Sequence, residues 1–230
     1  MSVQSLIKKL LFCLGFIAFG SYANAQVTLI TGPSDRITSP PTTSSAVGQI
    51  ISSGGSISLK IGSASTATDI IYQWYKLDST GVKHLVQSSS NSAYTETTTD
   101  AGYYTYQLVM SNSNQCTSDI SDPFKVYVLP VLNPTIAASS ATICSNGVSA
   151  STLTANPGNS KYSYLYQWAL NGTNIAGATA ATYTTTANTT GSNTYSVKVS
   201  YALSSTNTGT ASQIINIVPV PTKPAISVGQ

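Results

Sequence analysis

Hydrophobic and polar side chains alternate with a period of two in several short stretches of this chain. Ile57–Ile61, Tyr104–Leu108 and Tyr195–Val199 follow this pattern, and Phe124–Leu129 and Ile214–Val218 are rich in β-branched and aromatic residues. Clusters of Gly, Asn, Ser and Asp separate these stretches and predict turns. After the N-terminal segment no window shows sustained helical periodicity. Because many short strands within about a hundred residues are typical of β-sandwiches, the pattern predicts an all-β fold.

The same pattern occurs twice along the chain. Tyr94–Val131 aligns with Tyr183–Val220 without a gap at a fixed offset (183 − 94 = 89), and a Tyr-Gln-Trp triplet precedes each copy, at positions 72–74 and 166–168. A period near ninety residues is too long for a solenoid repeat. The repeat therefore predicts two tandem sandwich domains.

The N-terminus has the three parts of a secretion signal. Lys8 and Lys9 supply positive charge, Leu10–Phe19 is an apolar run, and residues 23–25 form an Ala-Asn-Ala cleavage site. The run is too short to span a bilayer comfortably, so we expect cleavage before Gln26 rather than a retained signal anchor. No later segment approaches the length of a membrane span. We therefore expect an exported protein, extracellular or at the cell surface, with no membrane span in the mature chain.

These features divide the chain into five expected segments. They are a signal peptide at 1–25, a lead-in segment at 26–47, the first domain at 48–130, the second domain at 131–220, and the start of a third repeat at 221–230.

The last of these segments repeats the opening of the second domain. Pro219–Ile226 parallels Pro130–Ile136 with one residue inserted. Either the chain is a fragment of a longer array, or it ends in a short extended strand. The proline-bearing junction Leu129–Pro134 predicts a stiff, extended spacer, and Val27–Ile30 in the lead-in segment predicts one further strand.

Charge is scarce, and this limits the candidate chemistry. Only 7% of residues are charged, and removal of Lys8 and Lys9 with the leader lowers the formal net charge from +3 to +1. Without a basic patch, nucleic acid is not an expected partner. All seven carboxylates lie at or before Asp122, and His84 is the only histidine. We therefore expect no cofactor, no metal site and no catalytic residues. A hydrolase would have to use Asp78, Glu96 or Asp100.

The first repeat resembles immunoglobulin domains. Trp74 lies in a Tyr-Gln-Trp-Tyr-Lys stretch, and Asp100-Ala101-Gly102-Tyr103-Tyr104-Thr105-Tyr106 is similar to the segment that carries the family's second cysteine. The resemblance implies that Tyr106 replaces this cysteine. It also implies that Tyr104 is a tyrosine corner, whose hydroxyl bonds a nearby backbone group, and that Asp100 has a structural role at this corner.

The second repeat matches the same pattern less fully. It keeps Trp168, Gly191 and Tyr195, but Thr189 replaces the Asp and Asn193 replaces the corner tyrosine. We therefore expect the sandwich without the corner. Both tryptophans are expected in the cores, where each contributes about 3–5 kcal/mol relative to Ala.

A narrower resemblance covers roughly residues 45 to 220. The runs at 141–147 and 166–172, the Thr-rich stretch and Tyr195–Val199 are similar to the Ig-like and PKD-like tandem repeats of large bacterial surface proteins. Such repeats occur in adhesins and in gliding-associated or type IX-secreted proteins. The resemblance implies a bacterial, exported, non-enzymatic protein.

Cys116 and Cys144 are the thiols of the expected mature chain. Export permits a disulfide, but if the domains lie end to end the two sulfurs are too far apart to bond. An interdomain bond, two free thiols and bonds to another chain all stay open.

Three functions compete. The domains serve as spacers or adhesive modules for an unknown protein or glycan at the cell surface, or for neighbouring repeats of the same array. Alternatively they form a carbohydrate-binding accessory module, with Tyr75, Tyr103, Tyr162 and Tyr164 stacking on sugars, or the chain is the N-terminal fragment of a larger surface protein or enzyme. The first of these is our main expectation.

Overall fold

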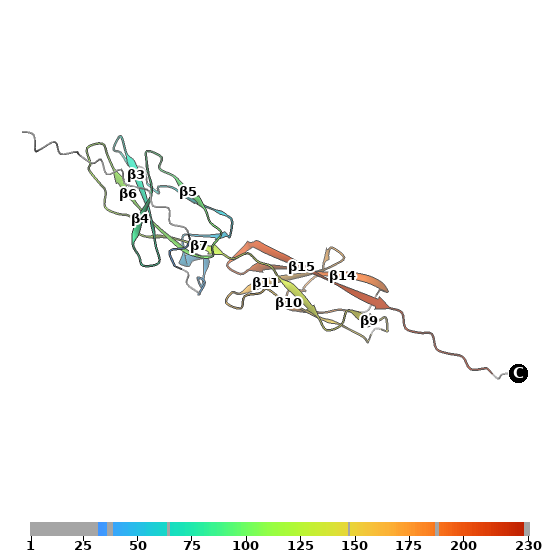
Figure 1. The fold of residues 1–230 in the computed structure, drawn as a ribbon. Helices are drawn as coiled ribbons and strands as arrows, with labels where there is room; N and C mark the ends of the chain where they lie inside the picture. Colours follow the sequence, from blue (N-terminus) through green and yellow to red (C-terminus); the bar gives the residue numbers. More distant parts are fainter. Residues whose placement is uncertain (1–31, 36–38, 64, 147, 187–188, 228–230) are drawn as a thin grey trace, which may run out of the picture.

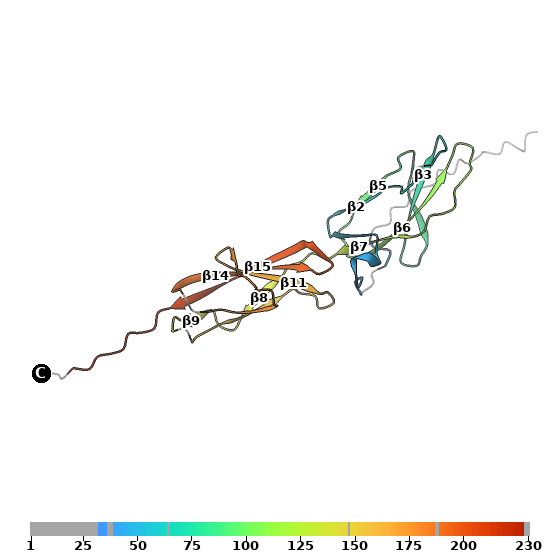
Figure 2. The ribbon, with the colours of Figure 1, turned by 180° about the vertical axis from the view of Figure 1, so that it is seen from behind.

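The computed structural model describes residues 32–35, 39–63, 65–146, 148–186 and 189–227. Within these ranges the chain is built from strands, with one 3₁₀ turn, η1 (Ser44–Ala46). The strands form two sandwiches that lie end to end, as Figure 1 and the reverse view in Figure 2 show. The prediction of an all-β fold with two tandem sandwiches is confirmed. The expected leader and the expected strand at Val27–Ile30 lie outside the described residues.

The first sandwich contains seven strands in two sheets. Its strands are β1 (Gln49–Ser52), β2 (Ser56–Leu59), β3 (Ile71–Leu77), β4 (Lys83–Ser89), β5 (Tyr94–Thr97), β6 (Gly102–Ser111) and β7 (Phe124–Leu129). One sheet has the order β1-β7-β6-β3-β4, and β2 pairs with β5 in the other. The β1–β7 pair is parallel, whereas the remaining pairs are antiparallel.

The second sandwich has eight strands in the same arrangement. They are β8 (Thr135–Ala138), β9 (Thr142–Cys144), β10 (Thr152–Asn156), β11 (Tyr164–Leu170), β12 (Thr173–Asn174), β13 (Thr182–Thr184), β14 (Gly191–Tyr201) and β15 (Ser204–Val218). The sheets have the orders β12-β11-β14-β15-β9 and β13-β10-β8. Strand β8 has no counterpart among the described residues of the first sandwich.

Alternation along the strands fills the cores, as the sequence predicts. In β2, Ile57 and Leu59 are buried between exposed serines, and in β14 the residues from Asn193 to Tyr201 are buried at every second position. Strand β2 ends at Leu59, two residues before the predicted end at Ile61.

Two described residues of the expected lead-in segment, Ser34 and Asp35, contact the first sandwich. Asp35 forms a backbone bridge with Tyr103 of β6, and the Ser34 hydroxyl accepts a hydrogen bond from the Thr105 amide, 2.9 Å away. Gly102 permits this approach because a Cβ there would lie 2.8 Å from the Asp35 carbonyl oxygen, and its φ of +145° disfavours other residues. Within the expected lead-in segment, Asp35 therefore extends the sheet of β6 by one bridge.

The corner between β5 and β6 also exists in the second sandwich. The Tyr104 hydroxyl donates to the Asp100 carbonyl oxygen at 2.9 Å, as the resemblance to immunoglobulin domains implies. Asn193 occupies the equivalent position and donates from Nδ2 to the Thr189 carbonyl oxygen at 3.1 Å. The expectation that the second repeat lacks the corner was wrong, because a side-chain amide reaches the same backbone group as the phenol.

Candidate functional site

The most elaborate arrangement of side chains lies at the junction of the two sandwiches. The hydroxyl oxygens of Tyr127, in β7, and Tyr162, just before β11, are 2.8 Å apart and share a hydrogen bond. The Tyr201 hydroxyl, at the end of β14, donates to the Pro130 carbonyl oxygen of the linker at 3.2 Å. Each domain thus supplies phenol groups that bond to the other domain or to the linker.

Contacts between aromatic rings join these three tyrosines and two neighbouring ones into one cluster. The junction tyrosines are Tyr103, Tyr127, Tyr162, Tyr164 and Tyr201. Ring centroids are 4.6 Å apart for Tyr103–Tyr127, 4.9 Å for Tyr162–Tyr201 and 5.3 Å for Tyr164–Tyr201. Tilted and edge-on aromatic pairs at such distances contribute about 0.5–1.5 kcal/mol each beyond the area they bury.

Burial of these rings favours their neutral forms. Desolvation, followed by the hydrogen bond with Tyr162, holds the pKa of Tyr127 far above its ordinary value. Desolvation likewise raises the pKa of Tyr201, and it raises the pKa of Tyr164 to about 12. Tyr127, Tyr164 and Tyr201 therefore stay protonated at neutral pH.

The linker is packed between the domains. Leu132 is buried, and the cluster of buried apolar residues that contains it includes Tyr127 and Leu129 of the first domain as well as Trp168 and Tyr201 of the second. The linker predicted as a stiff spacer at Leu129–Pro134 is therefore part of a core that continues from one domain into the other, although Val131 is 64% exposed.

Gly209 of β15 makes this packing possible. A Cβ on Gly209 would lie 2.3 Å from the Leu132 carbonyl oxygen and 2.5 Å from Pro134 Cδ. No side chain fits there without movement of backbone atoms. The close approach between β15 and the linker therefore requires glycine at this position.

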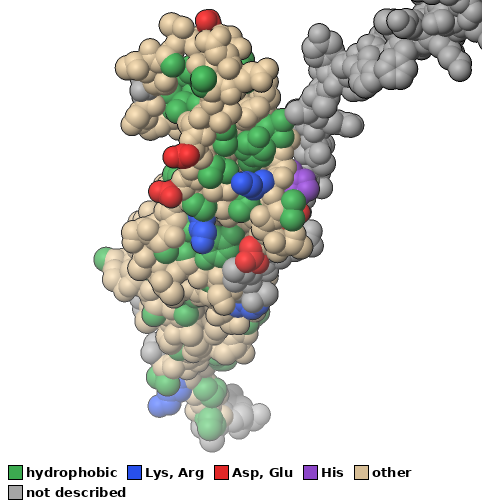
Figure 3. All heavy atoms as spheres, turned by 90° about the vertical axis from the view of Figure 1, so that its left-hand side faces the viewer, with side chains coloured by type: hydrophobic (Ala, Val, Ile, Leu, Met, Phe, Trp, Pro, Cys, Tyr) green, Lys and Arg blue, Asp and Glu red, His purple; other side chains and the backbone are tan. Residues whose placement is uncertain are grey.

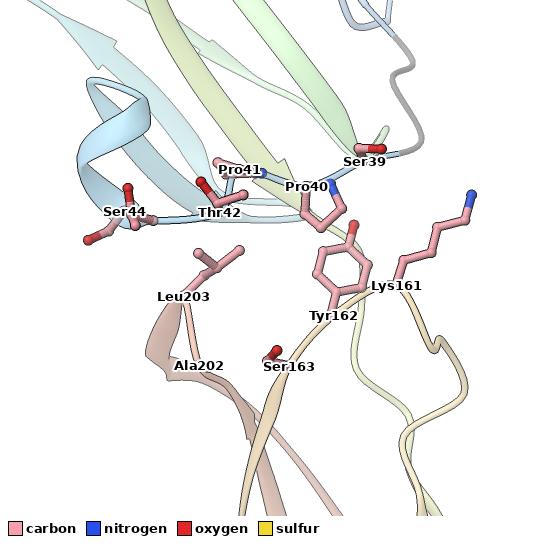
Figure 4. A pocket seen from close by; sticks show the side chains of 11 residues that line it. Ser39, Pro40, Pro41, Thr42, Ser44, Lys161, Tyr162, Ser163, Ala202 and Leu203 are labelled. Carbon is pink, nitrogen blue, oxygen red and sulfur yellow. The ribbon is translucent and has the colours of Figure 1, made fainter.

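An open cavity of about 830 Å³ lies beside the junction. Residues 39–44 form its first-domain wall, and Lys161, Tyr162, Ser163, Ala202 and Leu203 form the other. Figure 4 shows the Tyr162 ring directed toward Pro40 and the Lys161 side chain extended away from the cavity. Its lining is apolar and hydroxyl-bearing, with Lys161 as the one charged side chain in it.

A buried ion pair lies in the core of the first domain. Lys76 is 2% exposed, and its Nζ donates to Glu96 Oε1 at 2.8 Å. The hydroxyls of Tyr94 and Tyr106 donate to Glu96 Oε2 and Oε1, each at 2.6 Å. Burial, followed by the bond to Glu96, raises the pKa of both tyrosines far above the ordinary value. Both oxygens of this carboxylate are therefore bonded inside the fold.

Sequence reasoning did not identify Lys76, although a signal was present. Lys76 follows Trp74 by two positions in a strand, so both side chains point to the same face. Lys76 Nζ lies 4.7 Å from the centroid of the Tyr104 ring. The same alternation puts Glu96 on the inward face with Tyr94.

The remaining residues expected to be structural lie in or beside the cores. Five of them are buried, namely Trp74, Trp168, Tyr104, Tyr106 and Tyr195. Asp100 is exposed, and its backbone carbonyl oxygen accepts the hydrogen bond from the Tyr104 hydroxyl. The Trp168 indole donates to the Ala180 carbonyl oxygen at 2.9 Å. The Trp74 indole nitrogen is buried and has no hydrogen-bond partner among the described residues.

The four tyrosines considered for sugar binding are all half-buried. Tyr103, Tyr162 and Tyr164 belong to the junction cluster, and the Tyr162 and Tyr164 rings meet at 55°. Tyr75 lies apart from them on β3, paired with Gln107 and Leu85. They do not form a planar row that a sugar could cover.

The carboxylates considered for hydrolysis serve separate purposes. Asp78 closes the turn between β3 and β4, where its Oδ1 accepts from the Thr80 hydroxyl at 2.7 Å and its Oδ2 lies 2.7 Å from His84 Nε2. These hydrogen bonds, with Thr80 first and His84 second, hold the pKa of Asp78 well below its ordinary value of 3.8. In the parts of the chain that the structure describes, no three His, Cys, Asp or Glu residues form a group that could hold a metal ion.

Both thiols are free and lie at opposite ends of the molecule. Cys116 is exposed in the loop after β6, at the end of the first domain away from the linker. Cys144 ends β9 beside Val218, at the far end of the second domain. An interdomain disulfide is absent from this structure.

The surface carries few charges. Figure 3 shows isolated Lys, Asp and Glu side chains scattered among uncharged polar groups and small apolar patches. Within the described residues no helix has both the length and the apolar character needed to cross a bilayer.

No protein-family model and no curated protein matches this sequence. Among solved structures, the fibronectin(III)-like modules of Clostridium thermocellum CbhA share 15% identity at a TM-score of 0.43, covering 80% of this chain and 96% of that chain. The N-terminal four Ig domains of Dscam1 isoform 8.4 share 14% identity (TM-score 0.34), with 85% of this chain and 46% of that chain covered. Three N-terminal domains of the bacteriophage RB49 outer capsid protein Hoc share 18% identity (TM-score 0.36), with 73% and 56% covered. The chain thus spans about half of the Dscam1 and Hoc fragments, and at these scores the likeness concerns the sandwich architecture alone.

Proposed function

We propose that this chain is a non-enzymatic module of an exported, surface or extracellular protein, in which two immunoglobulin-like sandwiches act as a rigid spacer. The observation that supports this most is the apolar core that continues through the linker from Tyr127 and Leu129 to Leu132 and Tyr201. Domains in one chain normally move relative to each other unless their interface is large and apolar. A continuous core with hydrogen bonds across it keeps the long axes of the domains in line.

The low charge supports the same function. A spacer between a cell and its surroundings experiences changing salt concentrations, and a chain with 7% charged residues depends little on screened electrostatic contacts. The packed linker further favours the spacer over a pair of independently moving binding domains.

The proposal is tested on cells that export the protein. An antibody against the loop at 112–123, at the free end of the first domain, should label intact cells or the medium fraction. A glycan array probed with the purified chain should show no saturable binding. Detection only after cell lysis would contradict export. Saturable glycan binding that Tyr162→Ala abolishes and Tyr72→Ala preserves would instead favour the carbohydrate-binding module.

A further inference from the structure

The edge of the first sandwich contains a groove where the second sandwich has a strand. In the second domain β8 pairs antiparallel with β10, from Leu153↔Ala138 to Asn156↔Thr135. In the first domain β2 has β5 as its only strand neighbour within the described residues. A groove of about 580 Å³ opens there, and the apolar side chains that line it include Leu59, Trp74 and Leu108.

The pairing registers show which residues correspond. Leu59 pairs with Tyr94, and Leu153 pairs with Tyr183, which is the repeat equivalent of Tyr94. Residues 60–62 therefore correspond to Thr154–Asn156, the part of β10 that carries β8. Residues 58–62 line the groove, so the groove lies where a strand equivalent to β8 would pair. Without that partner, β2 stops at Leu59.

The C-terminal tail has the sequence of such a strand. Pro224, Ala225 and Ile226 repeat Pro134, Thr135 and Ile136, the first residues of β8 and the proline before it. In β8, Ile136 packs against the core. In the tail, residues 219–227 are exposed and form no strand, and Ile226 is 99% exposed.

We propose that the tail of one copy of this chain pairs with β2 of the next copy and fills its groove. By the register of β8, Ile226 lies opposite Ile61 with its side chain directed into the groove, and Ser227 lies opposite Lys60 with both side chains directed outward. The strand supplies backbone hydrogen bonds to the exposed edge of β2, and the isoleucine supplies apolar contact. The partner of the proposed spacer is thus a second copy of the same chain. This inference rests on the rigid shape proposed above.

The tail cannot reach the groove of its own chain. Figure 1 shows the tail leaving the second domain at the end away from the first. Nine extended residues reach about 30 Å, whereas β15 alone, with 15 residues, spans about 50 Å. The contact is therefore between copies. Because it joins two different surfaces, the contact is head-to-tail, and its repetition builds filaments, or rings where the rotation closes.

Cysteine cross-linking tests the register directly. Lys60→Cys and Ser227→Cys are introduced together into the full chain, with Cys13→Ser, Cys116→Ser and Cys144→Ser in the background. Both sites are exposed, so neither substitution should disturb folding. Mild oxidation should yield a ladder of disulfide-linked oligomers that a reductant dissolves. The control pairs Lys60→Cys with Thr222→Cys, which lies five residues earlier in the same tail and should cross-link poorly.

Self-association of the wild-type chain gives the second measurement. Sedimentation velocity should show concentration-dependent oligomers. Ile226→Asp should weaken them about tenfold or more, because a charge then enters the groove. Val220→Asp changes an exposed tail residue outside the proposed strand and should leave association unchanged. A synthetic peptide of residues 219–230 should dissociate the oligomers, whereas its Ile226→Asp form should not.

Three results would overturn the proposal. One is a chain that stays monomeric at all concentrations without cross-linking. Another is protection of the amides of residues 60–62 from hydrogen exchange in the monomer. This would mean that Val27–Ile30 of the same chain pairs with β2 and occupies the groove. The third is a longer natural product whose tail is protected within a third sandwich. These assays use purified protein, so a negative result would contradict the assembly of copies but not the proposed export and spacer function. Failure of the antibody labelling would contradict export but not the assembly.

Discussion

Tyr127 and Tyr162 share one hydrogen bond across the domain junction, with their hydroxyl oxygens 2.8 Å apart. Tyr127→Phe keeps the ring in the apolar cluster and removes only this bond. We expect a loss of about 1 kcal/mol in the free energy of unfolding, measured by urea denaturation. Tyr72→Phe is the matched control, because Tyr72 packs against the first core and its hydroxyl has no hydrogen-bond partner among the described residues. An equal loss in both variants would mean that the junction bond contributes nothing.

Gly209→Ala should destabilise the junction. The new methyl group would meet the Leu132 carbonyl oxygen at 2.3 Å, so either the linker or β15 must shift, at a cost of about 1–3 kcal/mol. Gly62→Ala is the control, since a Cβ there meets nothing within 4 Å. Thermal unfolding compares the two variants, and an unchanged melting temperature for Gly209→Ala would show that the linker is not packed as described.

Glu96→Gln should destabilise the first domain strongly. It removes the carboxylate charge that pairs with the Lys76 ammonium, which is 2% exposed, and breaking a buried pair from one side costs about 3–5 kcal/mol. The double variant Lys76→Met with Glu96→Gln removes both charges and should recover a large part of that loss. Urea denaturation of the wild type, Glu96→Gln, Lys76→Met and the double variant completes the cycle. Purely additive losses would mean that the two side chains do not interact.

Asn193→Ala should weaken the second domain as Tyr104→Phe weakens the first. Each substitution removes the hydrogen bond to the carbonyl four residues earlier, at 3.1 Å and 2.9 Å respectively. Further hydrogen bonds are lost with it, those of Asn193 with Gly191 and Asn171 and that of Tyr104 with Thr98. The expected loss is about 1 kcal/mol in each case, read from the unfolding of the affected domain. If Asn193→Ala has no effect, the amide does not replace the corner tyrosine.

Acid should weaken the turn that Asp78 closes. Hydrogen bonds from Thr80 and His84 hold the pKa of this carboxyl below 3.8 in the folded protein. A lowered folded pKa gives stability that is present above about pH 4 and lost as the pH falls further, toward the folded pKa. Asp78→Asn should therefore be less stable than the wild type at pH 7, and the gap should narrow below pH 4. Thr80→Val should reduce the pH dependence, whereas a gap that is constant across this range would contradict the assignment.

The alternation of side chains was enough to predict the strands around Ile57, Tyr106 and Tyr195, because burial on one face of a sheet imposes a period of two. The same rule would have put Lys76 inside. Sequence reasoning missed it because a lysine is rarely buried unless it is paired, and its partner Glu96 is twenty residues away.

The junction could not be predicted in this way. Its tyrosines come from four strands and a loop, and their meeting depends on how the domains are oriented. The role of Gly209 likewise depends on the path of the linker in space. The difference between β2, which has one strand neighbour within the described residues, and β10, which has two, became visible only when the pairing of β8 with β10 was known.

A packed junction makes the two domains one rigid body, so the separation of its far ends should be fixed. Single-molecule energy transfer is measured between a dye on Cys116 and one on Val148→Cys, in a Cys144→Ser background. Cys116 is exposed and Val148 is 86% exposed, so both accept labels without disturbing a core. The structure predicts one narrow distribution of efficiencies, which broadens when residues 130–134 are replaced by a Gly-Ser linker. A distribution in the wild type as broad as in the Gly-Ser variant would contradict it.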